Sequence, residues 1–115
     1  MNLKTLIASD FAAVVDNLEP LTVKLNRNTP ESILITDGHR DEMNRTLQSW
    51  GFVNVENDDV GFEFPAAEFN PIHNAAELRH LDQIVDGQGR TYVVQSANLA
   101  VLQTIWRAHC RIKNK

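Results

Sequence analysis

The residues best suited to chemistry in this sequence are four histidines, one cysteine and several carboxylates. His109 and Cys110 are adjacent, but neighbouring side chains on a strand point to opposite faces, so they would not form a nucleophile and base. We therefore interpret Cys110 as a small buried core residue. The histidines at 39, 73, 80 and 109 lack the spacing of metal ligands. We predict no catalytic residue and no metal site.

The carboxylates also favour structural interpretations. Asp58 and Asp59 are adjacent and precede an apolar strand pattern, which is typical of solvated turn residues. Residues 37–41 form the most polar cluster and are the first place to search for an unexpected site, although a loop is the favoured interpretation.

No nucleophile elbow, Walker phosphate loop or dinucleotide-binding glycine motif occurs in the sequence. The segment Gly87-Gln88-Gly89 contains two glycines, but a strand pattern follows it rather than a helix. No helix N-terminus would then face a phosphate, so we interpret the segment as a hairpin turn. We expect no cofactor.

Composition indicates one domain covering residues 1–115, because the chain is too short for two cores. The net charge of -4 argues against sequence-specific nucleic-acid binding. No apolar run is long enough to span a membrane, the N-terminus does not resemble a signal peptide, and a single cysteine excludes an internal disulfide. We expect a cytoplasmic protein, or one in a particle assembled there.

Charge is distributed unevenly along the second half of the chain. Between residues 56 and 86 every charged residue except Arg79 is acidic, whereas the charged residues from 87 to 115 are all basic. This is either a chance partition of solvated side chains or a sign of two unlike faces suited to head-to-tail association in a ring. Under the second hypothesis the candidate interaction residues are Arg107, Arg111, Asp58 and Asp59.

Hydrophobic periodicity in the first half predicts a helix and then strands. Spacings of three and four predict a helix at about 3–18, and alternation predicts a strand at 21–26. A second strand at 32–36 would be closed by the turn dipeptide Asp37-Gly38. Residues 39–50 fit either a helix ending at Gly51 or a polar excursion.

The second half predicts strands more clearly. A strand at 60–64 ends at Pro65, which would break it or leave it at a sheet edge, and residues 66–80 read as a loop with at most a helical turn. Strands near 81–86 and 90–97 would join through a turn at 86–89. Over 104–112, alternation places Trp106, Ala108, Cys110 and Ile112 in the core and Ile105, Arg107, His109 and Arg111 on a wet face.

These elements indicate a mainly β (α+β) protein. We expect a small antiparallel β-barrel or sandwich of five to six strands at about 20–112, preceded by the helix. The aromatic side chains are expected in its core, with interface anchors as the alternative.

The predicted hairpin carries a recognisable pattern. Leu81-Asp82-Gln83-Ile84 precedes the turn, and Gly89-Arg90-Thr91-Tyr92-Val93-Val94 follows it. Together with the upstream Phe64-Pro65-Ala66-Ala67-Glu68, this resembles the "G-D-x-I … G-x-x-Y-x-V" hairpin of small head–tail joining (connector or stopper) proteins of tailed bacteriophages and prophages. The resemblance covers about residues 60–112, and Leu81 stands where the pattern has glycine.

The resemblance implies a non-enzymatic subunit that assembles as a ring on a portal and contacts a tail completion protein. Long loops at 37–59 and 66–80, together with edge strands, would then reach neighbouring subunits. Two other hypotheses stay open. One is a host-encoded β-barrel module binding a peptide, glycan or small ligand, and the other is a small enzyme whose site is assembled from scattered loop residues.

Overall fold

The computed structural model describes residues 18–28, 31–42, 44–69, 78–101 and 104–113. Apart from Leu18, the helix expected at about 3–18 lies outside these residues, so the structure does not test it. No helix in the described part is long and apolar enough to cross a membrane.

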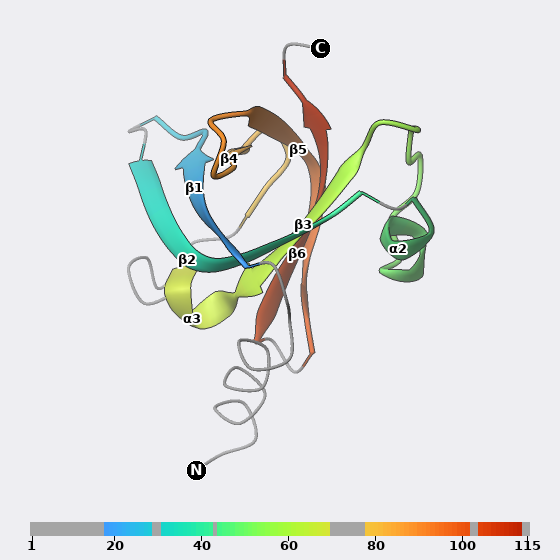
Figure 1. The fold of residues 1–115 in the computed structure, drawn as a ribbon, viewed down its shortest axis with the longest axis horizontal. Coiled ribbons are helices and arrows are strands. Elements are labelled where there is room, and N and C mark those ends of the chain that lie inside the picture. Colours follow the sequence, from blue (N-terminus) through green and yellow to red (C-terminus); the bar gives the residue numbers. More distant parts are fainter. Residues whose placement is uncertain (1–17, 29–30, 43, 70–77, 102–103, 114–115) are drawn as a thin grey trace.

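The described residues form a closed barrel of six antiparallel strands in the order β1-β2-β3-β6-β5-β4 (Figure 1). The strands are β1 Glu19–Leu25, β2 Glu31–Asp41, β3 Val60–Pro65, β4 Gln83–Val85, β5 Thr91–Ala100 and β6 Ile105–Ile112, and the helices are α2 Asn44–Ser49 and α3 Ala66–Phe69. The mainly β class and the barrel predicted from the sequence are confirmed.

Alternating apolar residues from all six strands fill the barrel interior. Phe62 and Tyr92 meet edge to face at 5.1 Å, and Phe69 of α3 closes one end against Trp106 at 5.8 Å. The buried core includes Leu21, Val23, Leu25, Ile33, Ile35, Phe62, Phe64, Phe69, Ile84, Tyr92, Val94, Trp106, Ala108 and Cys110.

The turn predicted at Asp37-Gly38 is wrong, because β2 continues through it to Asp41. Gly38 pairs with Glu19 at an irregularity in β1. A Cβ there would lie 2.4 Å from Leu21 side-chain atoms and 2.8 Å from the Glu19 carbonyl oxygen. Glycine is therefore needed for close approach of two strands rather than for a turn. The polar residues 37–41 lie on a strand and not in a loop.

Of the ambiguous residues 39–50, the first three belong to β2 and residues 44–49 form the helix α2, which Gly51 follows. Gly51 has a φ of +93°, the conformation that ends helices at glycine. Leu47 of α2 is fully buried because the helix lies against β3. A Cβ on Gly61 would lie 2.7 Å from Leu47 and 2.8 Å from Trp50, so glycine lets α2 sit on the outside of the barrel.

The hairpin predicted with its turn at 86–89 is confirmed, with β4 and β5 paired on either side. The Asp86 amide donates to the Arg90 carbonyl at 3.0 Å, and the Gly89 amide to the Asp86 carbonyl at 3.1 Å. Gly89 has a φ of +83°, which glycine adopts without steric cost.

The helix α3 forms part of the segment expected to be a loop. Its Glu68 carboxylate accepts hydrogen bonds from the backbone amides of Thr36 at 2.9 Å and Asp37 at 3.0 Å. Pairing of β2 with β3 begins only at His39, so this carboxylate satisfies β2 donors that no strand reaches. Pro65 ends β3, which lies inside the sheet between β2 and β6.

Alternation along β6 correctly predicts the inner side, and on the outer side it fails at His109 and Ile105 but not at Arg107 and Arg111. Trp106, Ala108 and Cys110 are buried, as predicted, whereas Ile112 is only partly buried against the core. His109 and Ile105 were expected on a wet face, but they are 2% and 6% exposed. For His109 the reason is a second layer: Phe52, in the loop after α2, packs against its ring at 5.6 Å.

Candidate functional site

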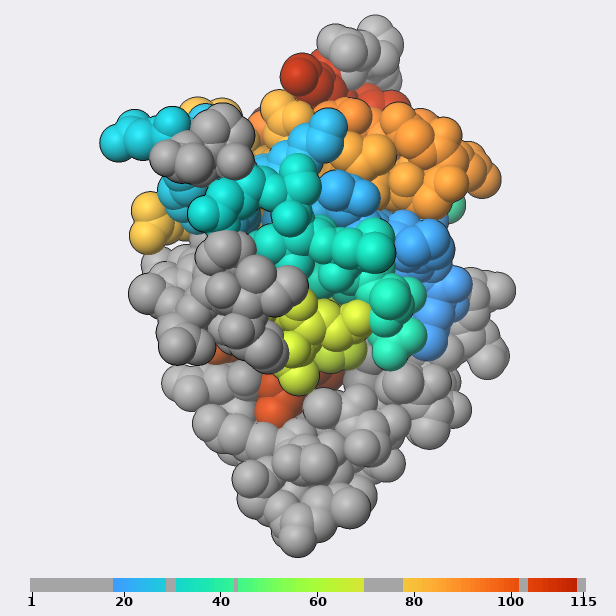
Figure 2. Space-filling view, turned by 90° about the vertical axis from the view of Figure 1, so that its left-hand side faces the viewer, coloured from blue at the N-terminus to red at the C-terminus, as the bar shows by residue number. Residues whose placement is uncertain are grey.

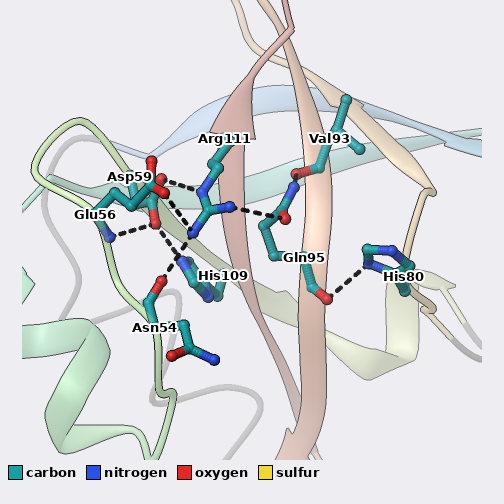
Figure 3. Close-up of polar contacts among 8 residues, drawn as sticks. All are labelled: Asn54, Glu56, Asp59, His80, Val93, Gln95, His109 and Arg111. Carbon is teal, nitrogen blue, oxygen red and sulfur yellow. Dashed lines mark hydrogen bonds and ion pairs between the residues drawn. The ribbon is translucent and has the colours of Figure 1, made fainter.

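A polar cluster links the loop before β3 to the outer side of β6 (Figure 3). Asp59 and His109, each 2% exposed, are joined by a contact of 2.5 Å between Oδ2 and Nε2. Arg111 donates from Nε to Asp59 Oδ1 at 3.0 Å. The interpretation of Asp59 as a solvated turn residue is therefore wrong. The wrong assignments of Asp59 and His109 are linked, since the two residues contact each other beneath the layer that carries Phe52.

The Asp59 carboxylate is held in its ionised form. Burial alone would raise its pKa, but hydrogen bonds from the Glu56 amide, His109 and Arg111 together hold the pKa below the ordinary value of 3.8. An ionised carboxylate only accepts hydrogen bonds, so the contact places a proton on His109 Nε2. This nitrogen of the imidazole is therefore engaged as a donor to Asp59 within the protein.

The Arg111 guanidinium ties three segments together. It donates from Nη2 to the Asn54 carbonyl at 2.8 Å and from Nη1 to Gln95 Oε1 at 3.4 Å, and it lies 3.5 Å from Glu56. Gln95 stands at a bulge in β5, which aims its side chain at Arg111. Arg111 therefore holds the loop before β3 in place and does not simply point into solvent.

Arg107 lies on the same outer side of β6 and is also engaged. Its Nε is 3.4 Å from Glu63, whose other oxygen is 3.1 Å from His39 Nδ1. The guanidinium carbon lies 5.0 Å from the centre of the Trp50 ring, a cation–π distance. Arg107 points outward from the barrel, as expected, but α2 and the loop that follows it partly cover the Arg107 side chain.

Asp58 is exposed, in contrast to Asp59 beside it. It helps to line a shallow depression of about 370 Å³ at one end of the barrel, together with Glu42, Asn57, Tyr92 and Ile112. Of the four candidate interaction residues, the structure therefore brings Asp59 and Arg111 into direct contact and leaves Asp58 at the surface.

Two further buried carboxylates hold barrel connections. Asp82 accepts from the amides of Asn26 and Arg79, each at 2.8 Å, and from Arg27 Nη1 at 2.7 Å. Asp86 pairs with Arg90 at 2.8 Å and with Arg40 at 2.9 Å. Burial would raise the pKa of Asp86, but the hydrogen bonds from Arg90 and Gln88 hold it below its ordinary value.

These ion pairs bear on the two hypotheses for the uneven distribution of charge along the chain. Arg111 pairs with Asp59, Arg107 with Glu63, and Arg90 with Asp86. The acidic stretch and the basic stretch therefore neutralise one another within the subunit at these positions. Charge order along the chain does not translate directly into two opposite faces.

Leu81 is a site that the sequence analysis did not identify. Its φ is +76°, a region that bulky residues rarely occupy and that costs roughly 1–2 kcal/mol for a residue with a Cβ. Its amide donates to the Val94 carbonyl at 2.9 Å, while the Val94 amide donates to the Asp82 carbonyl at 2.7 Å. The available signal was the hairpin pattern itself, which has glycine at this position.

The remaining described candidates, His80 and Cys110, have structural roles. His80 Nδ1 contacts the Gln95 carbonyl at 2.9 Å, while His73 lies outside the described residues. Cys110 is fully buried, and burial raises the pKa of its thiol, which keeps it protonated and unreactive. Among the described residues no group of three or more His, Cys, Asp or Glu could hold a metal ion.

Comparisons of the chain with family models, with curated proteins and with solved structures found no match.

Proposed function

We propose that this protein is a structural subunit of a tailed phage or prophage, acting without catalysis in head–tail joining by assembling as a ring on a portal. The observation that carries the proposal is the backbone of Leu81. The head–tail joining pattern has glycine there, and the position adopts a left-handed φ of +76° that glycine favours. The one departure from the pattern thus keeps the backbone conformation that the pattern implies.

The matching residues support the same proposal because each has a role in building the barrel. Asp82 is a buried carboxylate at the entry to β4, Gly89 sits in the turn with positive φ, and Tyr92 and Val94 point into the core. Ile84 is likewise buried. Each matching residue of the pattern therefore has a structural role in this hairpin or in the barrel core.

The burial of the His109–Asp59 pair supports a non-enzymatic role. Each residue is 2% exposed, and His109 Nε2 faces Asp59 Oδ2. A general base must come within hydrogen-bond reach of its substrate, and the Phe52 ring lies against this imidazole. The pair therefore acts as a clamp on the loop before β3.

The test is to delete the gene from the genome that carries it and to image the particles by electron microscopy. We expect filled heads and separate tails in the deletion, with joined particles restored by the wild-type gene supplied in trans. Normal numbers of joined particles in the deletion would contradict the proposal. Portal and major capsid genes beside this one would support it independently.

A further inference from the structure

The outer face of β2, β1 and β4 carries exposed apolar side chains beside a lysine. Thr22 pairs with Leu34 on one side and with Val85 on the other, so all three point outward together. Leu34 is 64% exposed, and Lys24 is exposed in the next row. Figure 2 shows this side of the molecule, with β1 and β2 in blue to turquoise.

A groove lies beside this face, where β1 and β4 close the barrel. It has a volume of about 390 Å³, and its lining includes Lys24, Leu81, Gln83 and Val93. The charged side chains in the lining are Lys24 and Arg27, both basic, and Arg27 is paired with the buried Asp82. The rim is apolar at Leu81, whose side chain is 49% exposed. A partner for this groove would carry acidic and apolar groups together.

The loop at residues 53–58 has that composition. It contains Glu56 and Asp58 but no basic residue. Val53 is 74% exposed, and the Glu56 side chain is 69% exposed. Hydrogen bonds from Arg111 and to Asp59 hold the loop in shape, so it is preorganised for contact.

The groove and the loop are two different surfaces of the barrel: residues of β1, β4 and β5 line the groove, whereas the loop is bonded to Arg111 of β6. Val93, which lines the groove, pairs across β5 and β6 with Arg111, and Arg111 donates to the Asn54 carbonyl of the loop. The loop follows α2 on the β3–β6 side, and Figure 1 shows α2 across the barrel from β1 and β2. Because the two complementary surfaces differ, their contact generates head-to-tail association rather than a two-fold dimer.

We propose that the groove of one copy receives the 53–58 loop of the next copy, with Val53 against Leu81 and the acidic side chains near Lys24. This contact rests on the ring assembly proposed above and specifies its surfaces. Opposite charge supplies steering and register, while the apolar contact excludes water. A closed barrel leaves no whole strand edge free, so faces and loops make the contact.

The backbone at Leu81 supports this choice of surface. A leucine held at positive φ and half exposed is strained without filling the core, and such strain concentrates at functional positions. Glycine would relieve the strain at no packing cost to the interior. The side chain is therefore explained by contact outside the subunit.

The interface can be tested by cysteine crosslinking of the purified chain, since Cys110 is buried and does not compete. Gln83→Cys marks the groove and Val53→Cys marks the loop. With a short bis-maleimide at high protein concentration, the double variant should give a ladder of dimers and larger species, whereas each single variant should stay monomeric. Val53→Cys with Val101→Cys, which marks an exposed position outside the groove, is the matched control and should give no ladder.

A double variant that gives no ladder, or single variants that crosslink equally well, would overturn the proposed contact. Neither outcome affects the particle test of head–tail joining, and joined particles in the deletion strain would not affect the crosslinking result. Failure of the contact is thus distinguishable from failure of the proposed function.

Leu81→Gly separates a contact role from a structural one. In the doubly cysteine-bearing chain it should keep or raise the melting temperature, because the strain is removed, and reduce crosslinking about tenfold. Val101→Gly relieves a similar backbone with a φ of +51° at the end of β5 and should leave the ladder intact. A ladder unaffected by Leu81→Gly would overturn the role of Leu81.

Discussion

The two sides of this barrel are built alike on the inside and differently on the outside. On the β3–β6 side, α2 and its loop add a second layer that buries Leu47, Phe52 and the Asp59–His109 pair. On the β1–β2–β4 side, Leu34 and Leu81 are exposed instead. We therefore expect substitutions in the buried second layer to change stability most, and substitutions of the exposed leucines to change association more than stability.

The largest effect is expected from the shared interior. Trp106→Ala should destabilise the fold by about 3–5 kcal/mol, because the side chain is 6% exposed and packs against Phe69. Urea unfolding measures this, with the exposed Val53→Ala as the control that should change stability little. An unchanged unfolding midpoint for Trp106→Ala would contradict the assignment of β6 to the core.

The next effect tests the covered side directly. Gly61→Ala should cost about 1–3 kcal/mol, because its Cβ would lie 2.7 Å from Leu47 and 2.8 Å from Trp50 and must push α2 away. Gly87→Ala is the matched control, since a Cβ there has its nearest neighbour at 3.4 Å. Equal unfolding midpoints for the two variants would show that α2 does not pack as described.

The same contrast explains how far the sequence alone could predict this molecule. Alternation along β6 predicts the interior because every barrel strand must fill it. Nothing in that pattern says what covers the outside, so His109 and Asp59 were assigned to solvent. Asp37-Gly38 misled for a related reason: glycine serves both turns and close strand contacts, and only the position of Leu21 decides between them. The candidate residue Arg111 was found by charge, but its partners come from distant segments.

A smaller effect concerns acid stability on the covered side. The pKa of Asp59 is lowered in the folded protein, so its contribution to stability is present above the unfolded value near 3.8 and is lost as pH falls through the folded value. Asp59→Asn should therefore reduce the loss of unfolding free energy between pH 5 and about pH 2. Part of the loss should remain, because the pKa of Asp86 is lowered as well.

The measurement is urea unfolding at a series of pH values. Asp58→Asn, one residue away and exposed, is the control that should change the pH profile less. If Asp59→Asn and the wild type lost stability in parallel over this range, the buried carboxylate would not be the source of the acid sensitivity.

The smallest effect on stability, and the sharpest test of the exposed side, is expected at Leu34. Its side chain is 64% exposed and its partner on β1 is Thr22, so Leu34→Ser should change the unfolding free energy by no more than about 0.5 kcal/mol. Leu34 lies in a row with Thr22 and Val85 that crosses β2, β1 and β4 beside the groove. Its exposed side chain therefore offers apolar surface to a neighbouring copy in the proposed contact. Leu34→Ser should therefore weaken crosslinking between positions 83 and 53 several-fold while the monomer unfolds normally. Loss of stability with undiminished crosslinking would reverse the comparison, because the face assigned to association would then be supporting the fold.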